Sequence, residues 1–376
     1  MNVVAAAGGS GGHCYPAVAF LQACKERHPD WTLTLAVNRG ARTMGLELEA
    51  AAARAVVEVE SAKFAGARSL VTPAFWSKIF RGLKESRRLL TELKADVVVG
   101  FGGYGSFPLV WEAASMKIPT VVHEQNAVMG TANRFLRSRA ARLAVSIELA
   151  ASPSAASGGR IVRTGFPVRS TLRRLDREAV IRRLELDPKK KTLLVFGGSQ
   201  GSRFINRLVT DTLVSFGDKL GADWQVLHLT GRAAASDGRT DELRPFLDPD
   251  LRPGSGRFYR QWPYSREMDA LYTAADLVVC RAGSATLHEL SYYGRPAILI
   301  PYPHANAHQL FNARVPADGG AAWILEENGC SPRRFKELLD QAAAQPETLQ
   351  KMGQNCSKAL KTDGAAALVD LVESLS

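Results

Sequence analysis

The sequence predicts an α/β protein built from two doubly wound parallel-sheet domains. In the second half, an apolar run over residues 192–196 precedes a glycine turn at 197–201 and apolar residues at helical spacing over 203–216. The same order occurs near the start, where the glycine turn 8–12 follows an apolar run over residues 3–7 and precedes a helical pattern that begins near Pro16. A length of 376 residues, 46% of them hydrophobic, suits two such cores.

The other elements follow from short apolar runs bounded by glycine, proline or charge, and from apolar residues three and four apart. The first half predicts a helix at 17–25 and strands at 31–37, 97–101, 119–123 and 161–164. The second half predicts helices at 177–186, 268–275, 332–344 and 347–375, with strands at 224–230, 277–280 and 296–301. We place the domains at 1–166 and 167–376, with a linker around 166–173, and the last helix is a candidate to pack back on the first domain.

The net charge of +11 indicates an anionic partner: a phosphate group, a nucleic acid or an acidic membrane surface. No nucleic-acid recognition motif accompanies this charge, so we expect no nucleic-acid partner. The five cysteines lack metal-ligand or redox spacing, which is typical of reduced thiols in a cytoplasmic protein. We expect no signal peptide, no membrane span, no metal site and no cofactor.

Two features of the first half argue against a dinucleotide-binding dehydrogenase. The strand at 31–37 ends in Asn38, where such folds carry an acidic residue for the ribose. Counted from Gly9, the sixth residue of the first glycine turn is Cys14, so the Gly-x-Gly-x-x-Gly spacing fails. The turns therefore indicate another phosphate-bearing ligand.

A glycine turn between a strand and a helix presents backbone N–H groups to a phosphate. In the second half, Gly198 and Gly201 allow close backbone approach, and the Ser199 hydroxyl adds a donor. A similar turn begins at residue 281, and Glu289, inside the helix that follows, can point towards the ligand. The alternative for each turn is a simple strand–helix connection without a ligand.

A basic helix with an aromatic stripe is predicted over residues 75–88. Its apolar residues are Phe75, Trp76, Ile79 and Phe80, and its cations include Lys78, Arg81 and Lys84. This pattern is typical of a helix that lies in a membrane interface. The alternative is an ordinary amphipathic helix whose stripe lies in the core.

Six short motifs occur in a fixed order: Gly-Gly-Ser-Gly-Gly-His at 8–13, Gly-Gly-Tyr at 102–104, His-Glu-Gln-Asn at 123–126, Gly-Gly-Ser-Gln-Gly at 197–201, Cys-Arg-Ala-Gly at 280–283 with Thr286 and Glu289, and His308-Gln309 with Asn312-Ala313. With these motifs the chain resembles the glycosyltransferases that add N-acetylglucosamine to lipid I in peptidoglycan synthesis. The resemblance implies the GT-B fold, in which two Rossmann-like domains face each other across a cleft.

The resemblance also implies the reaction and the partners. N-acetylglucosamine would pass from UDP-GlcNAc, on the C-terminal domain, to the 4-hydroxyl of the muramoyl sugar of undecaprenyl-diphosphate-linked lipid I, giving lipid II with inversion. The acceptor would be held by the N-terminal domain, and the basic helix would contact the anionic cytoplasmic face of the inner membrane. Other cell-wall synthesis proteins are candidate partners.

Site roles are carried over from the resemblance by matching position. The residues implied in UDP-GlcNAc binding are Ser10, Gly11, Gly12, Asn126, Arg169, Gly198, Ser199, Gln200, Gly201, Ser284, Ala285, Thr286, Leu287, Glu289, His308 and Gln309. Among them, Ser199 and its loop would hold the diphosphate, Glu289 the ribose hydroxyls, and His308 with Gln309 the sugar. Ser10, Gly11, Gly12 and Asn126 would line the sugar and acceptor side.

The chemistry needs a base on the acceptor hydroxyl and charge stabilisation on the leaving diphosphate. His13 is the first candidate base, because an unperturbed histidine is mostly neutral at pH 7. Its alternative role is to orient the loop or to bind an acceptor phosphate. Glu124 is the second candidate base, and Arg169 and the helix N-termini would stabilise the diphosphate without Mg²⁺.

Some residues depart from the family pattern. Ser10 stands where threonine is usual, Gly105 and Phe107 differ in the loop on the acceptor side, and the stretch 264–267 lacks the usual acidic pair, which leaves Trp262 or Tyr264 as uracil contacts. Three other functions remain: transfer to another lipid acceptor, UDP-GlcNAc 2-epimerisation, and nucleotide-sugar binding without catalysis.

Overall fold

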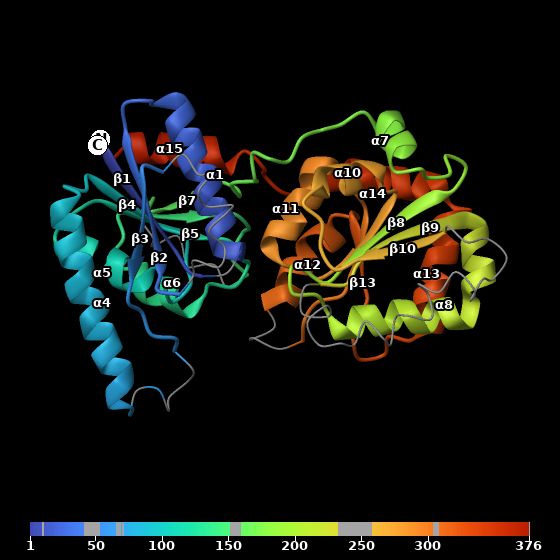
Figure 1. Ribbon diagram of the computed structural model, residues 1–376, viewed down its shortest axis with the longest axis horizontal. Coiled ribbons are helices and arrows are strands. Elements are labelled where there is room, and N and C mark those ends of the chain that lie inside the picture. The colour runs from blue at the N-terminus through green and yellow to red at the C-terminus, as the bar shows by residue number, and fades with distance from the viewer. Residues whose placement is uncertain are drawn as a thin grey trace. The chain divides into compact units, whose positions relative to one another are not determined.

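The structure is a computed structural model that describes residues 1–9, 11–40, 53–64, 69, 71–150, 159–231, 258–303 and 308–375 (Figure 1). The chain divides into two compact units. The first comprises Met1–Ser170 with Lys361–Ser376, and the second comprises Thr171–Leu360.

Within the described residues, the first unit has one parallel sheet in the order β3-β2-β1-β4-β5-β6-β7. Its strands are β1 Asn2–Ala7, β2 Thr32–Asn38, β3 Ala55–Val59, β4 Val97–Gly100, β5 Thr120–Glu124, β6 Arg142–Val145 and β7 Ile161–Arg163. Helices α1 Gly11–Arg27 and α15 Gly364–Glu373 pack on one face, and α4 Pro73–Glu92, α5 Phe107–Ser115 and α6 Thr131–Leu136 pack on the other. Because all strands are parallel, the turns after β1, β4 and β5 meet at one edge.

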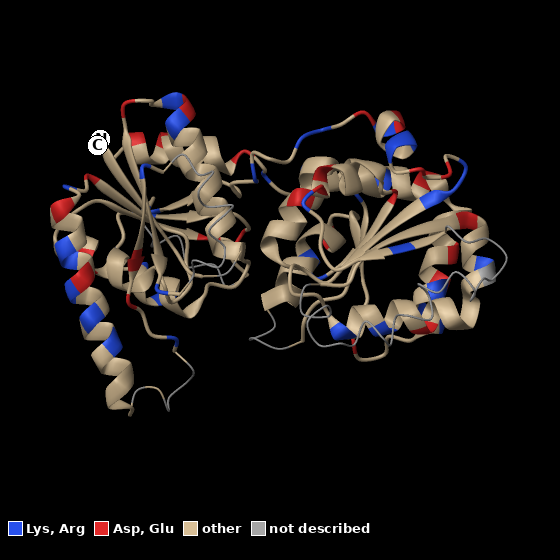
Figure 2. Ribbon diagram, viewed as in Figure 1, with Lys and Arg blue, Asp and Glu red and all other residues tan. Residues whose placement is uncertain are grey.

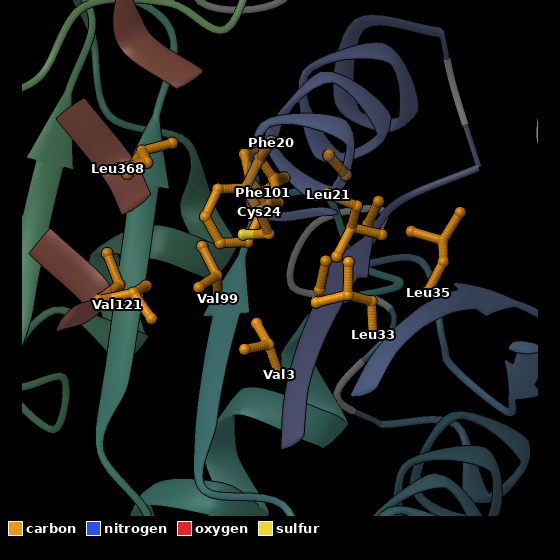
Figure 3. Packing of buried hydrophobic residues seen from close by; sticks show 14 of the residues in the cluster. Val3, Phe20, Leu21, Cys24, Leu33, Leu35, Val99, Phe101, Val121 and Leu368 are labelled. Atoms are coloured by element: carbon orange, nitrogen blue, oxygen red, sulfur yellow. The ribbon is translucent and has the colours of Figure 1, made fainter. Parts of the chain in front are cut away.

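The core under α1 holds this edge in place (Figure 3). Phe20 and Leu21 of α1 are fully buried against the sheet, and the rings of Phe20 and Phe101 lie 5.7 Å apart. Leu368 of α15 belongs to the same cluster. Burial of each such side chain contributes about 2 kcal/mol. Phe101 therefore anchors the glycine turn that follows β4.

The second unit has a parallel sheet in the order β10-β9-β8-β11-β12-β13 among its described residues. Its strands are β8 Lys191–Phe196, β9 Trp224–Leu229, β10 Tyr259–Trp262, β11 Leu277–Cys280, β12 Ala297–Leu299 and β13 Ala322–Ile324. Its helices are α7 Arg177–Arg183, α8 Arg203–Asp223, α10 Met268–Ala274, α11 Ser284–Tyr293, α12 His308–Asp318, α13 Pro332–Ala344 and α14 Pro346–Ala359. Two parallel sheets with helices on their faces confirm the predicted α/β class.

The structure corrects the predictions for α1 and for the helices at the end of the chain. Helix α1 begins at Gly11, so His13 lies in its first turn and not in a loop. Pro16 does not end this helix: it lacks an N–H, and only the carbonyl of Gly12 loses a helical donor. The single helix predicted at 347–375 is two helices, because the chain between them pairs Asp363 with Pro167 of the first unit.

In the part of the chain that the structure describes, no helix combines the length and the apolar character that a bilayer crossing requires.

Candidate functional site

His13 lies beside the turns that end β1 and β4. A methyl group on Gly102 would come 3.3 Å from Cδ2 of His13, and one on Gly103 would come 3.5 Å from its Cε1. The two turns are joined by the Gly8 N–H, which donates to the Gly102 carbonyl at 3.0 Å. Gly103 has a φ of 75°, and its methyl would lie 3.0 Å from Cα of Gly8, so only glycine lets the turns approach this closely.

The histidine in this position is held neutral. Burial lowers the pKa of His13 from 6.5 to about 4. At neutral pH the imidazole is therefore uncharged, which is the form that a general base requires. The position of the ring at the carboxyl edge of the parallel sheet, where ligands of such folds bind, suits that role.

The second candidate base, Glu124, is committed to the loop that follows β5. Glu124 is buried, with 1% of the residue exposed. Oε1 accepts from the backbone and side-chain nitrogens of Asn126 at 3.0 and 3.1 Å. Oε2 accepts from the Gly130 N–H and from Nδ2 of Asn133, both at 2.9 Å. A carboxylate with four donors orders its loop and is poorly placed to take a substrate proton, so we assign Glu124 a positioning role.

A buried polar chain runs behind this site. Nε2 of Gln125 donates to the Phe101 carbonyl at 2.6 Å and lies 3.3 Å from Nδ1 of His123. Nε2 of His123 lies 3.1 Å from the Gly165 carbonyl, which can only accept, so the ring carries its proton on Nε2. Gln125 thus ties the β5 loop to the glycine turn against which His13 packs. Sequence analysis gave His123 and Gln125 no role.

Arg169 belongs to the first unit and lies near the start of α1. Its guanidinium carbon lies 4.9 Å from the centroid of the Tyr15 ring. Tyr15 follows His13 by two residues, so Arg169 lies against the N-terminal part of α1, the part that also carries Gly11, Gly12 and His13. Asn126 is at the same sheet edge, after β5. Ser10 lies outside the described residues.

In the second unit, the turn 197–201 follows β8 and leads into α8. Gly198 and Gly201 have φ values of 94° and 83°, and the Gly201 N–H donates to the Gly198 carbonyl at 2.9 Å. A methyl on Gly201 would overlap the Thr230 carbonyl and lie 2.9 Å from Cα of Gly231. Residues 198–200, which include Ser199 and Gln200, are exposed. The turn is thus fixed on the side that packs against Thr230 and Gly231, and its residues 198–200 are open to a ligand.

A buried network supports this turn. Nε2 of His228 lies 3.1 Å from Oδ1 of Asn206, and Nδ1 of the same ring lies 2.9 Å from the Tyr259 hydroxyl oxygen. Asn206 also donates to the Thr230 carbonyl at 2.9 Å, which is the group that Gly201 packs against. The network therefore connects α8, β9 and β10 directly beneath the turn.

A second helix start lies at the same sheet edge. Strands β8 and β11 are parallel neighbours, so the turn after β11 lies next to the turn 197–201. Gly283 is the N-cap of α11, whose first turn is Ser284–Leu287, and a glycine has no side chain that could accept from the N–H groups of that turn. Glu289 is 8% exposed, and its Oε2 accepts from the Tyr272 hydroxyl at 2.8 Å. Two helix N-termini and one carboxylate are thus gathered at one edge, where the partial positive charge favours an anion.

The two predicted sugar-binding residues begin α12. Oε1 of Gln309 accepts from the Tyr302 N–H at 3.0 Å, which leaves the side-chain amide NH₂ to donate. His308 and Gln309 are partly exposed. Asn312, one turn further, is fully buried and donates to the Ala282 carbonyl at 3.2 Å, which fixes α12 against the turn after β11.

Arg281 is a residue of this edge to which the sequence analysis gave no role. Nη1 donates to the Ile300 carbonyl at 3.0 Å, and Nη2 donates to Oγ of Ser202 at 2.7 Å and pairs with Glu327 at 2.5 Å. One guanidinium therefore links the ends of three strands and the cap of α8. The sequence feature that could have indicated this role is the position of Arg281, directly after the wholly apolar strand predicted at 277–280.

The buried histidines predict a loss of stability in acid. Burial lowers the pKa of His123 to about 4 and that of His228 to about 3, and both side chains are inaccessible. Unfolding restores a pKa near 6.5, so the unfolded chain binds more protons below that pH and each histidine costs about 2 kcal/mol of stability by pH 5.

Thermal unfolding at pH 7.5 and pH 5 measures this effect. We expect His228→Gln to flatten the pH dependence of the transition of the second unit and to leave that of the first unit unchanged. A melting temperature of the second unit that does not change between the two pH values contradicts the assignment.

Comparison with known proteins identifies the class. Residues 3–145 match the glycosyltransferase family 28 N-terminal domain, and residues 192–368 match the glycosyltransferase family 28 C-terminal domain. Among solved structures, MurG of Acinetobacter baumannii aligns with a TM-score of 0.75 at 24% identity, covering 99% of both chains. A UDP-GlcNAc 2-epimerase from Neisseria meningitidis aligns with a TM-score of 0.64 at 14% identity, so the fold alone does not separate the two activities. The protein is a glycosyltransferase with the GT-B fold.

The sequence relatives narrow the class. A protein of Halothermothrix orenii is 35% identical over 99% of this chain and 98% of its own length, and one of Bacillus subtilis is 33% identical over 100% and 99%. Both are named UDP-N-acetylglucosamine–N-acetylmuramyl-(pentapeptide) pyrophosphoryl-undecaprenol N-acetylglucosamine transferase. The chain belongs to this transferase family, which confirms the family indicated by its motifs.

Proposed function

We propose that the chain transfers N-acetylglucosamine from UDP-GlcNAc to the 4-hydroxyl of the muramoyl sugar of lipid I, with inversion, to give lipid II. The donor and acceptor follow from the names of full-length relatives at 33–35% identity. The observation that carries the proposal is the edge of the second sheet, where the N-termini of α8 and α11 lie side by side and Glu289 stands within α11. This arrangement suits a nucleoside diphosphate.

The donor is assigned to that edge group by group. The N–H groups of the turn 197–201 and the Ser199 hydroxyl bind the diphosphate, together with the first turn of α11. The carboxylate of Glu289 accepts from the ribose hydroxyls. His308 and the amide of Gln309 bind the hydroxyls of the sugar. As the bond to the anomeric carbon breaks, the same N–H groups stabilise the negative charge that develops on the leaving UDP.

The first unit supplies the acceptor chemistry. His13 takes the proton of the attacking hydroxyl, because it is neutral at working pH and lies at the carboxyl edge of its sheet. Asn126, held by Glu124, and the backbone of Gly11 and Gly12 line the sugar side. Arg169 pairs with a phosphate of the donor.

An acceptor assay tests the substrate assignment. Radiolabelled UDP-GlcNAc is incubated with the purified chain and either a lipid I analogue or diacylglycerol, in the presence of EDTA. We expect label in the lipid I product alone. Label in diacylglycerol would support UDP-GlcNAc as the donor but disprove lipid I as the acceptor. Formation of a 2-epimer without transfer would show that the chain is an epimerase.

We further propose that α4 places the chain on the anionic cytoplasmic face of the inner membrane as a peripheral protein. The buried residues of α4 are Gly82, Ser86 and Leu90, and none of its first nine residues is buried. Its first half carries Trp76 and Phe80, which are 42% and 65% exposed. These aromatic residues therefore do not fill the core, which disfavours the alternative of an ordinary amphipathic helix.

The projecting end of α4, with the segment before it, forms an apolar tip surrounded by cations. The aromatic tip consists of Phe64, Val71, Phe75, Trp76, Ile79 and Phe80, which are exposed or partly exposed. Ring centroids of Phe64 and Phe75, Phe75 and Trp76, and Trp76 and Phe80 lie 6.4, 5.5 and 6.3 Å apart. Exposed Lys63, Lys78, Arg81 and Lys84 flank the tip (Figure 2). Aromatic residues at the tip and cations behind it suit an anionic lipid surface.

Substitution of the aromatic tip is expected to release the chain from membranes. In Trp76→Ala/Phe80→Ala, binding to phosphatidylglycerol vesicles falls by at least tenfold, because two large side chains can no longer enter the interface. Vesicle sedimentation measures the effect. Val214→Ala, which removes an apolar side chain that is 72% exposed on α8, is the control and binds as the parent does. Equal binding by the double variant would disprove the proposal.

A further inference from the structure

Tyr272 joins the two parts of the donor edge in the second unit. It lies on α10 and is fully buried, and its hydroxyl donates to Oε2 of Glu289 at 2.8 Å. Its ring meets Phe196 edge-on, with centroids 6.0 Å apart, and stacks on Tyr293 at 5.1 Å. Phe196 is the last residue of β8, directly before the turn 197–201. One side chain thus contacts both the carboxylate assigned to the ribose and the strand that carries the diphosphate turn.

We propose that Tyr272 is a positioning residue that fixes the Glu289 carboxylate for the ribose and thereby makes the site select ribonucleotide donors. The inference rests on the proposed role of Glu289. An ionised carboxylate only accepts hydrogen bonds, so the tyrosine hydroxyl is the donor in this pair. A carboxylate has about four acceptor positions, so Glu289 can accept from Tyr272 and from a ribose hydroxyl at once, and the bond from Tyr272 restrains the orientation of the carboxylate.

Packing alone does not account for the tyrosine. The Phe196 and Tyr293 rings contact the Tyr272 ring, and a phenylalanine would make the same ring contacts. A buried hydroxyl costs free energy unless it is paired, and the partner here is a charged group, which makes the bond stronger than one between neutral groups. The hydroxyl therefore has its effect at Glu289.

The test compares Tyr272→Phe with the parent on two donors, UDP-GlcNAc and its 2′,3′-dideoxyribose analogue, with a lipid I analogue as acceptor. We expect KM for UDP-GlcNAc to rise about tenfold, because a hydrogen bond to a charged group is lost. We expect kcat to change less than about twofold and the preference for the ribose donor to fall by a similar factor of ten. Tyr293→Phe, the same chemical change at a hydroxyl that donates to the Arg173 carbonyl, is the matched control and keeps the preference.

Glu289→Ala separates this inference from the proposed function. If Glu289→Ala removes the ribose preference and Tyr272→Phe adds nothing in that background, the two residues act as one unit and the inference holds. If Glu289→Ala removes the preference but Tyr272→Phe keeps it, the role of Tyr272 is wrong and that of Glu289 stands. If Glu289→Ala keeps the preference, both fail. Glu289→Gln replaces the alanine variant if thermal unfolding shows that the latter does not fold.

Discussion

In His13→Ala, kcat for transfer to a lipid I analogue is expected to fall by about 10²–10⁴-fold, the usual contribution of a positioned general base. Binding of UDP, measured by calorimetry, is expected to stay within about twofold, because the UDP contacts other than that of Arg169 are assigned to the second unit and His13 makes none of them. His28→Ala is the matched control: His28 directly follows the same helix, at the opposite end from His13. That variant should transfer at the parental rate.

The pH profile separates a base from a residue that only orients the loop. The pKa of His13 is about 4 in the free chain, so the acid limb of kcat/KM is expected well below pH 6.5. Substrate phosphates favour the protonated ring, so the acid limb of kcat should lie at higher pH. Full activity of His13→Ala would show that another residue is the base. If His13→Ala is slower but the acid limb of its pH profile is the same as in the parent, His13 only orients the loop.

Gly201→Ala is expected to abolish measurable UDP binding and to destabilise the second unit by at least about 2 kcal/mol. The new methyl would overlap the Thr230 carbonyl and crowd Gly231, and the φ of 83° is itself strained for alanine. The turn can relieve the overlap only by moving away from the support under it. Calorimetric titration with UDP and thermal unfolding measure the two effects.

Gly329→Ala is the matched control for strain. Its φ is 90°, close to that of Gly201, but a methyl there meets nothing within 4 Å. It should cost about 1 kcal/mol of stability and leave UDP binding unchanged. UDP binding by Gly201→Ala with parental affinity would show that this turn does not hold the diphosphate.

The central strands could be predicted from the sequence because burial on both faces makes them continuous apolar runs. Strands β1, β4, β8 and β11 were found within one or two residues. The strands that were missed include β3, β10 and β13, which lie at sheet edges. An edge strand buries less, and β10 reads Tyr-Arg-Gln-Trp, without a run or an alternation of apolar residues.

The site could be predicted only as far as its loops. Glycines at strand ends carry a local signal, so the turns 102–106 and 197–201 were found. The contacts that support these turns leave no local signal in the sequence, because they join residues that are distant along the chain. These contacts are Tyr272 to Glu289, Arg281 to Ser202, and Gln125 to the carbonyl of Phe101. Such pairs depend on which strands become neighbours.

Glu124 illustrates the same limit. Its place after a buried strand made it a candidate base, but four donors from residues 126–133 occupy its carboxylate. The helical periodicity of α4 likewise left a core stripe and a membrane stripe equally open. The resemblance to the transferase family favoured the membrane, and the tertiary structure supports it, because none of the nine residues before Gly82 in α4 is buried.

The most direct measurement is a single-turnover reaction of the purified chain with radiolabelled UDP-GlcNAc and a lipid I analogue in EDTA, followed by nuclear magnetic resonance of the product. We predict one N-acetylglucosamine on the 4-hydroxyl of the muramoyl sugar in the β configuration, and no product in the same time with His13→Ala. A product with retained α configuration, or no transfer to lipid I by the parent chain, would contradict the account.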